Sequence, residues 1–149
     1  MSLETKIATD LKTAMRAKDK AALRSIRAIK AQILLAKTDG SGKELDEAGE
    51  IKMLQKMVKQ RKDSLGIYEK QGRDDLAQTE REEIAVIEKY LPKQMDEAEL
   101  TGFLKGVITQ TGASSMKDMG KVMGIASKQL GGKADGKTIS GVVKKLLMS

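Results

Sequence analysis

The sequence contains no cysteine and no histidine, and these absences remove several kinds of catalytic and metal site. Without cysteine there is no disulfide, no thiol nucleophile and no thiolate metal ligand. Without histidine there is no imidazole base, no Ser-His-Asp triad and no histidine zinc site. We therefore expect no catalytic residues, no metal and no cofactor on this chain.

Aromatic residues are almost as scarce, because the 149 residues include only Tyr68, Tyr90 and Phe103 and no tryptophan. The core must be built from Leu, Ile, Val, Met and Ala, a set that favours helices over sheets. No segment of four or more alternating apolar and polar residues requires a strand. The sequence predicts an all-α fold.

Long apolar runs are also missing, and none approaches the ~18 residues of a membrane-spanning helix. The first residues, Met1 to Glu4, include an acidic side chain and lead directly into a helical pattern, which is not typical of a signal peptide. These two observations predict a cytoplasmic protein with no membrane partner.

Proline occurs once, and Pro92 marks the best candidate boundary between two parts of the chain. Five glycines precede it and nine follow it, although the part that follows is shorter. A proline disfavours helical backbone at the residue before it, so a helix is expected to stop here. We predict a four-helix subdomain over residues 1–92 and a three-helix subdomain over residues 93–149.

Apolar residues that recur every three or four positions predict where the helices lie. In the first helix, Leu3, Ile7, Leu11 and Met15 would share the buried face. Most of the helices are preceded by a side chain that can accept a hydrogen bond from first-turn amides. These N-cap candidates are Ser2, Asp19, Asp46, Asp74, Asp96 and Ser115. A polar segment at 39–46 predicts a loop.

Charge is distributed unevenly along the chain, whose net charge is +7. Residues 1–40 carry +5, residues 41–92 carry −2, and residues 93–149 carry +4. Within the last part, residues 112–149 alone carry +5. Every basic residue after Pro92 is a lysine, which contacts phosphate as a point charge and lacks the bidentate base recognition of arginine. These lysines either keep a small protein soluble or bind the phosphate backbone of structured RNA, and composition alone favours solubility.

The segment from Gly131 to Thr138 has the spelling of a nucleotide-binding P-loop, with Gly136 and Lys137 at the required spacing. A P-loop follows a buried strand, whereas the preceding segment has helical periodicity. We therefore interpret it as a turn between two helices, with a glycine C-cap and an aspartate N-cap. Alternatively, the amides of this turn receive an RNA phosphate together with Lys133 and Lys137. The residues expected to shape the turn are Gly131, Gly132, Asp135 and Gly136.

Several ordered segments resemble the GatB/YqeY family, and together they extend over almost the whole chain. They are Leu-Lys-Thr-Ala-Met-Arg-Ala-Lys-Asp at 11–19, Gly-Arg-Asp-Asp-Leu at 72–76, Tyr-Leu-Pro-Lys-Gln-Met at 90–95, Met-Gly-Lys-Val-Met at 119–123 and Ala-Asp-Gly-Lys-Thr-Ile-Ser at 134–140. Glu80, Glu83 and Ile84 also match the family pattern. The chain most resembles the stand-alone YqeY type.

The resemblance implies a non-catalytic helical module related to the tail of the B subunit of glutamine-dependent tRNA amidotransferase. That enzyme converts Glu-tRNA(Gln) or Asp-tRNA(Asn) to the amide, and its tail helps to hold the tRNA. The kinase-like cradle and the amidase subunit have no counterpart here, so the family label of carbon–nitrogen ligase with glutamine as amido-N-donor attaches by association. The implied partners are tRNA and amidotransferase or aminoacyl-tRNA synthetase components. The lysines expected to contact RNA phosphates are Lys121, Lys128, Lys133, Lys137, Lys144 and Lys145.

Two other functions stay open at this point. The first is a protein-interaction adaptor with no RNA role, which would bind a partner through its long third helix and acidic middle segment. The second is a true amide-transferring enzyme, which is the weakest of the three because neither a nucleophile nor an ATP site is visible.

Overall fold

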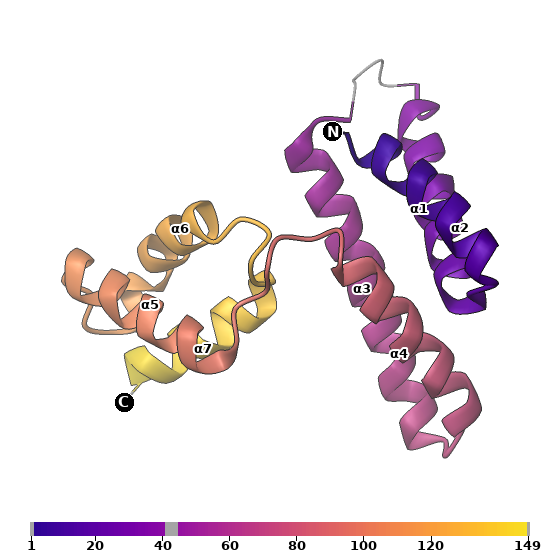
Figure 1. Ribbon diagram of the computed structural model, residues 1–149. Coiled ribbons are helices and arrows are strands. Elements are labelled where there is room, and N and C mark those ends of the chain that lie inside the picture. Colours follow the sequence, from indigo (N-terminus) through magenta and orange to yellow (C-terminus); the bar gives the residue numbers. More distant parts are fainter. Residues whose placement is uncertain (1, 41–44, 149) are drawn as a thin grey trace. The chain divides into compact units, whose positions relative to one another are not determined.

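The computed structural model describes residues 2–40 and 45–148, and within them the chain forms seven α-helices, a short 3₁₀ helix and no strand (Figure 1). The elements are α1 (Leu3–Ala17), α2 (Lys20–Lys37), α3 (Glu47–Lys70), α4 (Asp74–Glu88), α5 (Glu97–Thr111), η1 (Met116–Asp118), α6 (Met119–Gln129) and α7 (Gly136–Met148). The predicted all-α fold is confirmed. Residues 41–44 of the expected loop lie outside the described residues. No helix of the described part has the length and apolar character that a membrane span requires.

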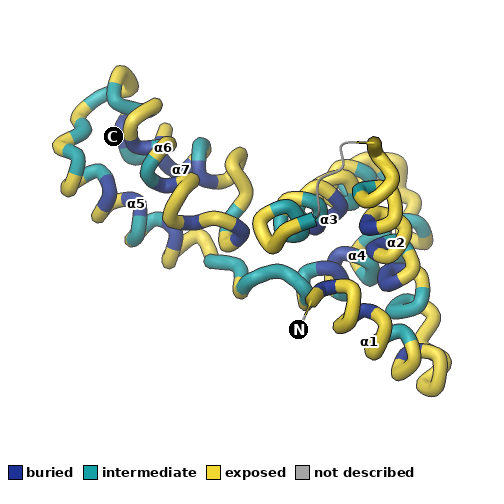
Figure 2. The backbone as a smooth tube through the Cα atoms, turned by 90° about the horizontal axis from the view of Figure 1, so that it is seen from above, coloured by how far each residue is buried: buried dark blue, intermediate teal, exposed yellow. Residues whose placement is uncertain are grey.

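The chain divides into two compact units, Met1–Leu91 and Pro92–Ser149, and each has an apolar core of its own. The first unit holds α1 to α4. Within it α3 packs against α4, α1 against α2, and α2 against α4. Buried residues lie on the helix sides that face one another (Figure 2). Fully buried isoleucine and leucine side chains each contribute about 1.5–3 kcal/mol to stability. Ile29, Leu54 and Ile87 are such residues in this unit.

The second unit holds α5, η1, α6 and α7, and its three α-helices all contact one another. Leu100 and Leu104 of α5, Val122 of α6 and Val143 of α7 are almost completely buried at their meeting point. Aliphatic residues dominate this core, and Phe103 packs against its edge. The scarcity of aromatic residues therefore does not prevent a second core from forming.

Side-chain caps fix most of the predicted helix starts. Ser2, Asp19, Asp46 and Asp96 each accept a hydrogen bond from an amide in the first turn of the helix that follows. Ser115 and Asp118 form a capping box. The Ser115 side chain accepts from a backbone amide of the first turn, and the Asp118 side chain accepts from the Ser115 amide. These contacts satisfy amides that would otherwise have no partner at the helix ends.

Two details of the predicted helices are wrong. Asp74 is the first residue of α4 and not its N-cap; Arg73 occupies that position and makes no capping bond with its side chain. Met15 is 56% exposed, while Ala14 is buried in its place. An α-helix advances 100° per residue, so a strict four-residue spacing drifts off the buried face, and a three-residue step after Leu11 restores it.

Polar contacts also join the helices of the first unit. The Tyr90 hydroxyl, just after α4, donates to Asp10 Oδ2 on α1 across 2.5 Å. Arg61 on α3 lies 3.8 Å from the Glu83 carboxylate on α4. Burial, followed by the nearby Glu83 charge, raises the pKa of Glu80 above its usual value, although Arg61 acts in the opposite direction.

The first residues of the second unit are bonded to the turn between α6 and α7. The side-chain amide of Gln94 donates to the carbonyl of Pro92 at 2.8 Å and to that of Gly132 at 2.6 Å. The Met95 amide donates to the Lys133 carbonyl at 2.9 Å. This segment and the turn therefore support each other, and both lie at the same end of α6.

Candidate nucleic-acid interface

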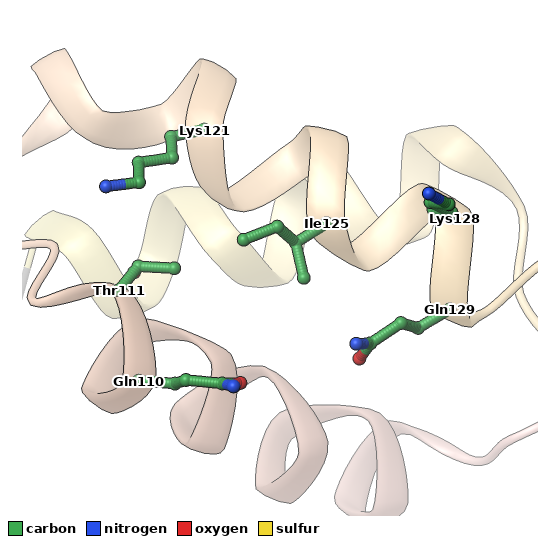
Figure 3. A pocket seen from close by; sticks show the side chains of 6 residues that line it. All are labelled: Gln110, Thr111, Lys121, Ile125, Lys128 and Gln129. Atoms are coloured by element: carbon green, nitrogen blue, oxygen red, sulfur yellow. The ribbon is translucent and has the colours of Figure 1, made fainter.

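A hollow of about 730 Å³ lies between α5 and α6 on the surface of the second unit (Figure 3). Two of its residues end α5 and four come from α6. They are Gln110, Thr111, Lys121, Ile125, Lys128 and Gln129. The volume lies within the range of small-ligand sites, but this hollow is open and its rim carries two ammonium groups.

The periodicity of α6 explains which of its residues reach the hollow. Val122 and Ala126 are buried in the core of the unit. Residues three and four positions apart share a helix side, so Lys121, Ile125 and Lys128 follow one another along the neighbouring side. The two lysines are seven residues apart, which places their backbones about 10 Å apart along the helix.

The charge of the hollow is positive and uncompensated within the described residues. Neither Lys121 nor Lys128 forms an ion pair there, and no carboxylate lines the hollow. At the end of α5, the carbonyls of Thr109 and Ile108 already accept hydrogen bonds from the amides of Gly112 and Ala113. The hollow is therefore suited to an anion such as phosphate.

The other four predicted lysines are exposed but do not line the hollow. Lys133 lies in the α6–α7 turn, and Lys137, Lys144 and Lys145 lie on α7. Lys145 is 3.9 Å from Glu97 of α5, and both side chains are at least three-quarters exposed. Such exposed pairs contribute little to stability, but the Glu97 carboxylate offsets part of the positive charge of Lys145.

The four residues expected to shape the α6–α7 turn differ in what the backbone requires of them. Gly132 has φ +82°, which a residue with a Cβ rarely adopts. Asp135 caps α7 by accepting from the Thr138 amide at 2.6 Å. Gly131 and Gly136 are not among the residues with positive φ, and a Cβ at Gly136 would meet open space.

The same turn is a poor place for a phosphate. It joins helix α6 to helix α7, whereas a P-loop joins a strand to a helix. The Asp135 carboxylate already occupies the amino-terminal end of α7, where its negative charge repels a second anion. The geometry therefore favours the connector interpretation for these residues.

Sequence reasoning missed the other residues of the hollow: Gln110, Thr111, Ile125 and Gln129. The spacing of Ile125 and Gln129 with Lys121 was a signal, because it places all three on one side of a helix. The part played by Gln110 and Thr111 depends on how α5 packs, which the spacing within one helix does not show.

Seven basic side chains on α1, α2 and the turn between them are also exposed, and the sequence analysis gave them no role. None of them forms an ion pair within the described residues. They are Lys6, Lys12, Arg16, Lys18, Lys20, Arg27 and Lys30. The +5 charge of residues 1–40 was the available signal.

Comparison with known proteins gives the family. A family model described as "Yqey-like protein" matches residues 4–147. The chain belongs to the YqeY-like family. This YqeY-like chain is similar to several yeast proteins that carry the name "Altered inheritance of mitochondria protein 41, mitochondrial".

The protein of that name from Meyerozyma guilliermondii is 38% identical over 128 residues, which cover 82% of this YqeY-like chain and 65% of the relative. The protein from Kluyveromyces lactis is 34% identical over 138 residues, covering 91% of the chain and 70% of the relative. The protein from Clavispora lusitaniae is 39% identical over 112 residues, covering 71% and 65%. The YqeY-like chain thus spans about two thirds of the length of these relatives.

The names of these relatives contradict the expectation of a cytoplasmic protein, because they describe mitochondrial proteins. That expectation was wrong for a physical reason. A missing apolar run and an acidic start argue against membrane insertion and secretion, but they do not distinguish the cytoplasm from the interior of an organelle.

Proposed function

We propose that this chain is a non-catalytic module that binds the phosphate backbone of tRNA through its second unit. It would act in association with glutamine-dependent tRNA amidotransferase, as the family resemblance implies. The observation that carries the proposal is the α5–α6 hollow, whose rim holds Lys121 and Lys128 with no carboxylate beside them. Lys133, Lys137, Lys144 and Lys145 would add to the positive charge of the unit without lining the hollow.

The composition of the second unit supports backbone contact over base recognition as the source of affinity. All its basic residues are lysines and its one aromatic residue, Phe103, packs against the core. Base stacking on aromatic side chains and bidentate arginine contacts are therefore missing. Each phosphate that a lysine neutralises releases counterions, so affinity should fall steeply with salt.

The test is a salt titration of tRNA binding, followed by fluorescence anisotropy with labelled tRNA. Lys121→Ala combined with Lys128→Ala should flatten the slope of log affinity against log salt by about one to two units. Its matched control combines Lys12→Ala with Lys30→Ala, two exposed helical lysines of the first unit that form no ion pair within the described residues. This control removes the same charge and should leave more of the slope in place.

Equal slopes for the two double variants would mean that net charge, and not the hollow, governs binding. If the protein does not bind tRNA even at low salt, the proposal is wrong and the adaptor function takes its place. Pull-down of protein partners in the presence of ribonuclease would then be the next measurement.

A further inference from the structure

Two glutamines of the hollow have no part in neutralising phosphates. Gln110 lies in the last turn of α5 and Gln129 is the last residue of α6, and Figure 3 shows their side chains extending toward each other across the space between the helices. Both residues are exposed, and neither side chain makes a hydrogen bond within the described residues. Their amide groups are therefore available to a ligand.

A side-chain amide offers both a donor and an acceptor, the pattern that the edge of a nucleobase complements. Ile125 lies on α6 between the two lysines in sequence and is half-buried, so it offers an apolar contact beside the amides. The hollow thus combines groups for a phosphate, a base edge and an apolar base face.

A base inside a continuous RNA duplex cannot reach these groups, because its pairing edge is engaged and the major groove is deep and narrow. An unpaired base in a loop or bulge can be turned outward and enter a hollow of this size. Stacking on an aromatic ring is not available there, so the gain in affinity from an unpaired nucleotide should stay within about tenfold.

We propose that the α5–α6 hollow receives one unpaired nucleotide of the bound RNA. Gln110 and Gln129 bond the base edge, Ile125 contacts its face, and Lys121 and Lys128 hold the adjoining phosphates. This inference rests on the proposed RNA-binding function and adds a selectivity for unpaired nucleotides to it.

The experiment compares two probes, an RNA duplex and the same duplex with one single-nucleotide bulge. The native protein should bind the bulged RNA about five- to tenfold more tightly than the duplex. Gln110→Ala combined with Gln129→Ala should bind both RNAs equally and keep the native salt slope on the duplex. The matched control, Gln32→Ala with Gln60→Ala, removes two exposed glutamines of the first unit and should keep the preference.

The outcomes separate this inference from the function on which it rests. Salt-dependent binding of both RNAs with no preference for the bulge overturns the nucleotide inference and leaves backbone binding in place. A preference that survives loss of Gln110 and Gln129 also overturns it, because the nucleotide would then lie elsewhere. Failure to bind either RNA or tRNA overturns both. Unchanged melting temperatures confirm that the exposed substitutions leave the fold intact.

Discussion

Lys18 adopts a backbone conformation that usually belongs to glycine. It ends α1 with φ 55° and ψ 35°, and its amide donates to the carbonyls of Ala14 and Met15. A Cβ in this left-handed region is unfavourable, and glycine avoids that cost. The strain is tolerated because the tight turn lets α2 begin at Lys20, directly after the Asp19 cap.

Lys18→Gly should therefore stabilise the first unit by about 0.5–1 kcal/mol, since relief of the strain exceeds the entropy that glycine loses on folding. The melting temperature should rise by about 2–5 °C. Lys12→Gly, in the middle of α1, is the control and should lower stability by about 1 kcal/mol. A fall in melting temperature for both variants would show that the turn gains nothing from glycine.

Glu80 gives the first unit a pH dependence of defined sign. Its pKa is raised, chiefly by burial and then by Glu83, so the folded state holds the proton more tightly than the unfolded state does. The resulting stability is present below the unfolded pKa and is lost as the pH rises through the folded one. At neutral pH the charged carboxylate is therefore unfavourable.

Glu80→Gln should raise the melting temperature by about 1–3 °C at pH 7, and the gain should shrink as the pH falls through the raised pKa of folded Glu80 and vanish below the usual glutamate range. Thermal unfolding followed by circular dichroism at several pH values measures this. The opposite sign at pH 7 would mean that attraction to Arg61 outweighs burial.

At the scale of elements, we expect α6 to contribute more to RNA binding than the turn after it. The α6 lysines Lys121 and Lys128 share a hollow without carboxylates, whereas Lys133 and Lys137 flank the Asp135 carboxylate. Lys133→Ala with Lys137→Ala should therefore flatten the salt slope by less than the pair of α6 substitutions does. A larger effect from the turn pair, measured on the same tRNA, would move the centre of the interface to the turn.

Local patterns predicted the helices well, because capping and amphipathic spacing act within a few residues. Ser2, Asp19 and Asp46 show this, since each accepts the expected amide. Such local patterns could predict only some of the residues that line the hollow. Lys121 and Lys128 could be identified from charge, but the contribution of Gln110 depends on which side of α6 packs toward α5, a tertiary property.

At the scale of the whole molecule, the two cores are separate in sequence. The buried residues of one core come from Leu3 to Ile87 and those of the other from Leu100 to Leu147. The bonds of Gln94 and Met95 also stay within the second unit. A piece of about 60 residues can fold alone when its core is complete.

We therefore predict that residues 92–149 fold without the rest of the chain. The isolated fragment should have a helical circular dichroism spectrum and a cooperative thermal transition. A fragment beginning at residue 96 omits Gln94 and Met95 and should melt at a lower temperature, because the α6–α7 turn loses two hydrogen bonds, at the carbonyls of Gly132 and Lys133. A non-cooperative melt of the 92–149 fragment would contradict the division.

The position of both tyrosines in the first unit also determines which part of this protein ultraviolet spectroscopy reports on. Both tyrosines, Tyr68 and Tyr90, belong to the first unit, and the second unit has only Phe103. Tyrosine absorbance and emission therefore follow the first unit alone, while circular dichroism follows the helices of both. Two melting curves from one sample can thus show whether the halves unfold together, without a label or an added chromophore.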